Sequence, residues 1–314
     1  MATENPLPRL RDSDRIQRFA ESLQYQSVRA REVGGIIVSN DMAKVGLVIM
    51  AVFVLTAIFA PQIAPHDPQE RVILDDGTWV KSHPPSLEYP FGTTSTAHPI
   101  FSQVVYGTRV AFFMGLLTSA IVGGFGTVVG LVAGFYGGRT ENVLMRIVDV
   151  AFGVPFLPFI IVLIMVAGGG SILNMIIAIS LITWRNTARV IRAEVVSIKE
   201  QPMIDAARAS GASNRRIVFY HIFPKVLPIT LLYSIFAIGW VIIAEAGLSF
   251  IGLGDPEVIS WGKTLNMAHV NQALSNELWF WFVPPGAAIV LFVMSAYLIA
   301  QGVEEVVNPQ LREY

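Results

Sequence analysis

Cysteine is absent from this sequence and charge is scarce, since Asp, Glu, Lys and Arg make up only 14% of the 314 residues. Without cysteine the chain can form no disulfide and no thiolate metal site. Soluble domains carry roughly 25% charged residues. The low charge, with 53% hydrophobic residues and a mean hydropathy of +0.57, therefore excludes an ordinary soluble enzyme. The net charge of −1 lacks the basic surplus typical of nucleic-acid binding, so we expect a polytopic membrane protein with no nucleic-acid partner.

Long runs without charged residues are what the sequence has instead. The third run has 35 residues, about 52 Å as one helix, whereas the hydrocarbon core of a bilayer is roughly 30 Å thick. It must fold back, and the expected hinge is Gly168-Gly169-Gly170-Ser171. Because lipid cannot satisfy backbone polar groups, each run should be helical, which predicts an all-α protein with six transmembrane helices. The runs are residues 45–60 (continuing to 64), 110–135, 150–184, 226–244 and 278–302.

The second run and its end carry a glycine ridge. Gly126, Gly130, Gly134 and Gly138 follow one another at intervals of four residues. Such a ridge lets another helix approach closely, and we interpret it as a packing surface.

Lysine and arginine lie mostly on one side of the expected spans. Seven precede the first span, two lie between the second and third, eight lie between the fourth and fifth, and one is in the tail. Only Arg71, Lys81, Arg109 and Lys263 fall on the other side. Because cytoplasmic segments are enriched in Lys and Arg, we expect a multi-pass protein of the cell (cytoplasmic or inner) membrane with both termini in the cytoplasm.

This topology divides the chain into five parts. The first is a cytoplasmic arm in which Asp12-Ser13 can cap an amphipathic helix on the inner membrane surface; a partly disordered tail is the alternative. The expected parts are the arm (1–43), the first transmembrane helix (44–64), an extracytoplasmic loop (65–100), a five-helix core (101–301) with a cytoplasmic loop at 190–225, and a cytoplasmic tail (302–314).

The cytoplasmic loop between the fourth and fifth spans has the pattern of a short helix. Pro202 suits the first turn, and Asp205 lies early enough to complement the helix dipole. Ala206, Ala207 and Ala209 make a surface with little side-chain bulk. A small-faced helix below the membrane is suited to a protein partner. The alternative is an interfacial loop whose arginines pair with anionic membrane lipid.

The residues that follow predict a break and a second helix. Gly211 fits a left-handed C-terminal cap. Ser213 or Asn214 can then start a second short helix, which Pro224 and Pro228 are expected to end before the fifth span.

The same loop resembles that of a known family. Asp205-Ala206-Ala207-x-x-x-Gly211, with Pro224 thirteen residues later, resembles the EAA loop of binding-protein-dependent ABC importer permeases. The leading Glu of the motif is Asp205 here, which keeps the charge with a shorter reach. The isoleucine position is His221, with Ile222 beside it, a form similar to the peptide-importer branch.

Several further segments resemble that branch in the same order along the chain. The long N-terminal arm is similar to the C-type rather than the B-type permease subunit of dipeptide and oligopeptide importers, and the resemblance covers residues from about 10 to 312. The acidic residues usual after Gly92-Thr93 are missing. The segments are residues 89–93, 105–109, 245–254, 279–286 and 308–311.

The resemblance implies a type I ABC importer permease fold and a non-catalytic subunit without a cofactor. Its implied partners are a B-type permease, two ATP-binding subunits and an extracytoplasmic solute-binding protein, and its implied cargo is dipeptides or oligopeptides, with oligosaccharides or a nickel complex as alternatives. It also implies a coupling helix that contacts an ATPase subunit. The residues it assigns to that contact are Asp205, Ala206, Ala207 and Gly211, with Arg208 as a further contributor.

Two residues of the fifth span are candidates for the pathway. Glu245 is the exception among nearly acid-free spans, and we name Glu245 and Ser249 as possible pathway or gate residues. A charge at the bilayer centre would cost about 2.5–3.5 kcal/mol and less near the interface. The alternative is therefore that Glu245 is a partly solvated structural acid at the outer end of the span.

Other function classes find weaker support in the residues. Trp261-Gly262-Lys263-Thr264 imitates the end of a phosphate-binding loop, but Glu257 occupies the position of its first glycine. A stand-alone secondary transporter would place acids near the midplane of inverted repeats, and we find no internal repeat. The five histidines have no metal-ligand spacing, so no metal site is expected.

An intramembrane aspartyl protease is the rival from the enzyme classes. Gly252-Leu253-Gly254-Asp255 fits that family's Gly-x-Gly-Asp pattern, and Asp149 could be the second acid. However, Pro256 disfavours the helix that should present Asp255. The topology also places the two aspartates at opposite membrane faces.

Overall fold

The computed structural model describes residue 35 and residues 39–307. Every long element in this part of the chain is a helix. Its β-bridges are two isolated pairs, Ile73–Trp79 and Thr93–Pro99, in the long connection between α3 and α4, residues 64–99, which we call the outer loop. The all-α prediction is therefore confirmed. The amphipathic helix expected after Asp12-Ser13 and the segment at 308–311 lie outside the described residues.

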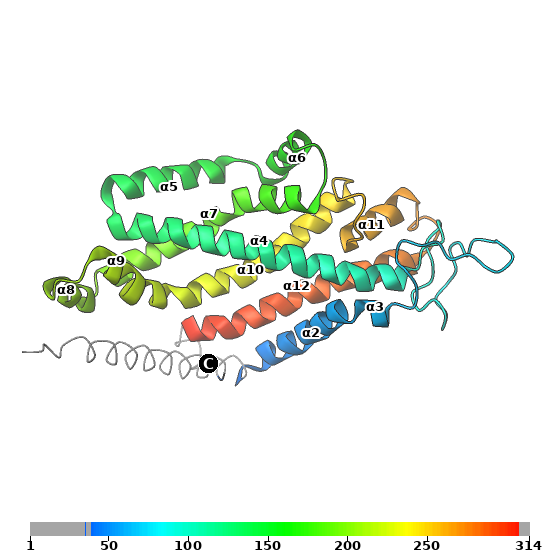
Figure 1. Cartoon of the computed structure of the whole chain (residues 1–314), viewed down its shortest axis with the longest axis horizontal. Coiled ribbons are helices and arrows are strands. Elements are labelled where there is room, and N and C mark those ends of the chain that lie inside the picture. Colours follow the sequence, from blue (N-terminus) through cyan, green and yellow to red (C-terminus); the bar gives the residue numbers. More distant parts are fainter. Residues whose placement is uncertain (1–34, 36–38, 308–314) are drawn as a thin grey trace, which may run out of the picture.

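Long helices run side by side along the longest axis of the molecule (Figure 1). The outer loop lies at one end of this bundle and α8 and α9 lie at the other. The elements are α2 (Asp41–Ile58), α3 (Ala60–Ile63), α4 (Ile100–Tyr136), α5 (Gly138–Gly153), α6 (Phe156–Val166), α7 (Ile172–Lys199), α8 (Pro202–Ala209), α9 (Asn214–Arg216), the π-helical η1 (Ile217–Ile222), α10 (Phe223–Phe250), α11 (Trp261–Val270) and α12 (Trp279–Val307).

Four helices of the described chain are long and apolar enough to cross a membrane, and α5 with α6 makes a fifth if that pair, bent by 93°, counts as one span. The four are Asp41–Ile58, Ile100–Tyr136, Asn214–Phe250 and Trp279–Glu305. The fourth expected span corresponds to α7, which is apolar only as far as Trp184 before its arginines begin. The chain is thus a multi-pass membrane protein, while the count of six remains a prediction.

The third charge-free run breaks twice. At the expected hinge, Gly168 and Gly169 have φ of +92° and +113°, which favours glycine because other side chains clash there. Ser171 then caps α7 by accepting a hydrogen bond from the Asn174 N–H at 3.1 Å. The second break, before Pro155, was not predicted. It ends α5 and turns the chain into α6, because a proline disfavours helical backbone in the preceding residue.

The glycine ridge packs α4 against α7. A Cβ added at Gly126, Gly130 or Gly134 would lie 2.7 Å from the nearest atom of Thr187, Ala188 or Val195, respectively. These glycines therefore let the two helices approach closely, as expected. Gly138 is different, because it begins α5 and faces open space.

The prediction that Pro224 and Pro228 end a short helix is wrong. The chain continues through α9, η1 and α10 as one helical path, Asn214–Phe250. Pro224 occupies the first turn of α10, where its missing N–H removes little. The wider π-helical turn directly before it, in which the Phe223 N–H bonds the Val218 carbonyl, changes the hydrogen-bond register at this point. Pro228 lies inside α10 and forfeits one bond of a 28-residue helix.

Candidate functional site

The short helix α8 forms as the sequence predicts. Pro202 lies in its first turn, and Gly211 just beyond its end has φ of +78°. The Ala212 N–H bonds the Ala207 carbonyl at 3.0 Å, which closes the left-handed cap. Ser213 caps the following turn by accepting from the Arg216 N–H at 3.4 Å.

The exposed surface of α8 contains most of the residues assigned to the ATPase contact. Asp205, Ala206, Arg208 and Gly211 are exposed, and Asp205 pairs with Arg208 at 3.5 Å. Ala207 is partly buried instead, against a hydrophobic cluster that includes Ile204. An exposed ion pair of this kind contributes about 0–1 kcal/mol, so both charges remain available to a partner.

Two anchors that the sequence analysis missed attach α8 to the bundle. Ile204 is fully buried, in a cluster that includes Ile198 of α7 and Ile222 of η1. The Lys225 ammonium donates to the Gln201 side-chain oxygen at 2.6 Å and so links α10 to the residue before α8. Ile204 and Ala207 lie three residues apart and so share one face of a helix, which was a usable signal for the first anchor. No local pattern signals the second.

Arginines of α7 bind residues of α5 and are not free. Arg189 pairs with Asp149 at 2.7 Å, and its guanidinium lies 3.9 Å from the centre of the Phe152 ring. Arg192 pairs with Glu141, and Arg185 donates to the Ala151 carbonyl. These contacts hold α5 alongside the C-terminal half of α7.

The two aspartates considered for an aspartyl protease each bind other partners. Asp149 is bound to Arg189, as above. Asp255 accepts hydrogen bonds from the N–H groups of Ile172 at 3.2 Å and Glu257 at 3.0 Å. An aspartyl dyad requires two carboxyls that share a proton, and this pair has no such arrangement.

Glu245 and Ser249 are brought together inside the chain. Glu245 is 6% exposed and accepts from the Ser249 hydroxyl at 2.7 Å, and the Ser260 hydroxyl also bonds its carboxyl group. Gly262 of α11 allows α11 to lie directly over this part of α10. Any side chain there would clash, because an added Cβ would lie 2.7 Å from Ala246. The expectation that Glu245 is partly solvated is therefore wrong: α11 packs closely over α10 and covers it.

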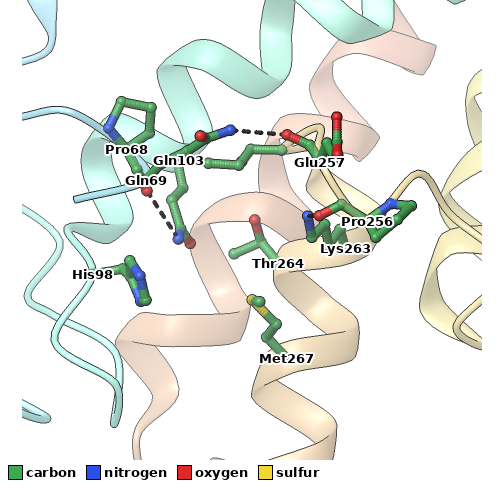
Figure 2. Close-up of a pocket in the computed structure, with 10 residues that line it drawn as sticks. Pro68, Gln69, His98, Gln103, Pro256, Glu257, Lys263, Thr264 and Met267 are labelled. Carbon is green, nitrogen blue, oxygen red and sulfur yellow. Dashed lines mark hydrogen bonds between the residues drawn. The ribbon is translucent and has the colours of Figure 1, made fainter. Parts of the chain in front are cut away.

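A polar cavity of about 520 Å³ lies at the outer end of the bundle. Figure 2 shows the Gln103 and Thr264 side chains extending into it, with His98 on one side and Lys263 on the other. Its walls come from the outer loop, the start of α4, the α10–α11 connection and α11. The lining residues are Pro68, Gln69, His98, Gln103, Pro256, Glu257, Ile259, Lys263, Thr264 and Met267.

A second cavity of about 510 Å³ lies among α4, α5, α7, α10 and α12. Five aromatic rings line it, and its polar members are Thr183, Asn186, Thr187 and Arg189. No residue of this cavity was predicted from the sequence to line a pathway, since the rings come from separate helices. The rings are Phe152, Tyr233, Phe236, Trp240 and Tyr297.

Comparison with known proteins gives two family matches. Residues 126–313 match the family described as binding-protein-dependent transport system inner membrane component. Residues 34–85 match the N-terminal TM domain of oligopeptide transport permease C.

Individual relatives match over most of their length. The oligopeptide transport system permease protein OppC of Bacillus subtilis is 32% identical, over 88% of this chain and 88% of its own. The dipeptide transport system permease protein DppC of Alkalihalophilus pseudofirmus is 32% identical, over 92% and 93%. The glutathione transport system permease protein GsiD of Escherichia coli is 33% identical, over 87% and 88%.

Proposed function

Because the chain belongs to the family of binding-protein-dependent transport system inner membrane components, we propose that it is the C-type permease subunit of an ATP-driven importer of short peptides. Peptide cargo is supported by the relatives, whose names specify oligopeptide, dipeptide and glutathione transport. The subunit carries out no catalysis itself. Separate ATP-binding subunits hydrolyse ATP.

The proposed assembly contains a B-type permease, two ATP-binding subunits and an extracytoplasmic solute-binding protein. This chain forms half of the translocation pathway, and its termini lie in the cytoplasm. The distribution of lysine and arginine supports that orientation. In that orientation α8 lies on the cytoplasmic side, and the polar cavity of Figure 2 lies on the extracytoplasmic side.

The observation that carries the proposal is the exposed helix α8. It presents Asp205, Ala206 and Arg208 outward, while the buried Ile204 joins it to α7 and η1. A movement of an ATPase bound to α8 is therefore transmitted to the bundle. ATP binding closes the ATPases and drives the spans from inward-open toward outward-open. This requires the closed ATPases to bind one permease conformation more tightly, because equal affinity for both shifts nothing.

The test is a mild-detergent pull-down of the tagged chain from its native membranes, with all co-purifying chains identified. We expect a second permease and ATP-binding subunits. Asp205→Arg reverses a charge at the proposed contact and should reduce ATPase recovery about tenfold, equivalent to ~1.4 kcal/mol. Glu304→Arg, at an exposed acid of α12, is the matched control and should retain the ATPases. Recovery of the chain without any ATPase under ATP-trapping conditions would contradict the proposal.

A further inference from the structure

The outer cavity is enclosed by two segments that are joined to each other. The Gln69 side-chain amide donates to the Glu257 carbonyl at 2.8 Å, which links the outer loop to the α10–α11 connection (Figure 2). The His98 ring is hydrogen-bonded to the Thr96 hydroxyl at 2.9 Å and to the backbone of Gln69. The polar side chains on this wall are thus occupied with holding the cavity together.

Gln103 has an acceptor that no described residue satisfies. Its side chain is 3% exposed, and its amide nitrogen donates to the Pro68 carbonyl at 3.4 Å. Its Oε1 has no hydrogen-bond partner in the described chain. Because buried polar atoms are nearly always paired, this unpaired acceptor on the cavity wall offers a hydrogen-bonding position to a water or a ligand that brings an N–H or O–H group.

Lys263 supplies the opposite chemistry at the other side of the cavity. Its ammonium donates to the Pro256 carbonyl, and an ammonium has three donors, so two remain. Burial lowers the pKa of Lys263, while Asp255 and Glu257 favour its charged form. The cavity therefore combines an unpaired acceptor with a cation that has free donors.

We propose that this cavity is a binding site for a short peptide, with the peptide carboxylate on Lys263 and a peptide N–H group on Gln103 Oε1. The volume of about 520 Å³ lies within the roughly 300–1,000 Å³ typical of small-ligand sites. The site rests on the proposed function and adds to it: the permease itself holds the peptide at its outer end, separately from the solute-binding protein.

The experiment measures binding of radiolabelled L-alanyl-L-alanine to the assembled permease–ATPase complex in nanodiscs, with no solute-binding protein present. We expect saturable binding that weakens at least tenfold in Lys263→Met and in Gln103→Leu. Gln103→Glu is the second variant, for the case that the leucine variant fails to assemble. It keeps an acceptor and should retain binding. Lys81→Met, at an exposed extracytoplasmic lysine that does not line the cavity, is the matched control and should bind as the wild type does.

The same dipeptide with an amidated C-terminus tests whether Lys263 binds the peptide carboxylate. It should bind the wild type weakly and lose nothing further in Lys263→Met. Absence of dipeptide binding to the wild type, or equal binding by all variants, would overturn the proposal. So would a Lys263→Met variant that binds dipeptide normally but no longer docks the solute-binding protein, which would assign the cavity to docking instead. Normal ATPase recovery in these variants separates such a failure from a failure of the proposed function.

Discussion

The Lys225 ammonium and the Gln201 side-chain oxygen lie 2.6 Å apart, so a hydrogen bond joins the first turn of α10 to the residue before α8. The buried Ile204 and the contact of the same ammonium with the Met203 sulfur at 2.9 Å also attach α8 to the neighbouring helices. If α8 receives the motion of an ATPase, this bond is part of the path by which the motion reaches α10.

We therefore expect Lys225→Met and Gln201→Leu each to lower peptide uptake by three- to tenfold. The loss of a hydrogen bond to a charged group, about 1.5 kcal/mol, supports a change of that size. The double variant should be no worse than Lys225→Met alone, because both substitutions remove the same Lys225–Gln201 hydrogen bond and only Lys225→Met also removes the contact with the Met203 sulfur. Lys199→Met is the control, since Lys199 forms no hydrogen bond or ion pair with the rest of the described chain. Additive losses would show that the two residues act separately.

Gly211→Pro should abolish ATP-dependent uptake while membrane insertion stays normal. Proline requires φ near −65°, whereas Gly211 has φ of +78°, and its N–H bonds the Arg208 carbonyl at 2.9 Å. The cap of α8 is lost in the variant. Gly77→Pro in the outer loop is the matched control. Gly77 has φ of +82°, and its N–H donates a hydrogen bond to the Leu74 carbonyl at 2.8 Å. Uptake that survives in Gly211→Pro, or is lost equally in both variants, would contradict the coupling assignment.

Glu245 can be tested for a structural role against a role in gating. Glu245→Ala leaves the Ser249 and Ser260 hydroxyls without their acceptor inside the protein, which costs about 1–3 kcal/mol. Glu245→Gln keeps an acceptor oxygen at the same place. If the acid is structural, the alanine variant should melt several degrees lower in detergent and the glutamine variant should transport normally. Normal melting of both variants with uptake lost in both would instead indicate a gate.

Acid should loosen the outer loop through His98. Burial first, and then the positive charge of Arg71, hold the pKa of His98 below its ordinary value. The unfolded loop then binds a proton more readily than the folded loop, so the stabilising contribution is complete above the unfolded pKa of about 6.5 and is lost as pH falls below it. Limited proteolysis of residues 65–99 should accelerate between pH 7 and pH 5. His98→Asn should remove this acceleration, and an unchanged pH profile in that variant would count against the assignment.

Local chemistry in the sequence accounts for a large part of the fold. A bilayer permits only helices in long apolar runs, so α2, α4, α10 and α12 follow from composition. The hinge at Gly168 and the cap at Gly211 follow from residue types that permit left-handed backbone. Pro202 begins α8 for a similarly local reason. The break before Pro155 also has a local cause, because a proline disfavours helical backbone in the residue before it.

Tertiary structure alone decided which of these residues meet. Lys225 and Gln201 are 24 positions apart, and Gln69 and Glu257 are 188 apart. Glu245 is buried because Gly262 lets α11 pack onto α10. The outer cavity joins residues of the outer loop, α4 and α11. A local pattern determines that a segment is helical and which residues begin and end it. The pairing of side chains across distant segments depends on how close the helices pack, which no single stretch of sequence contains.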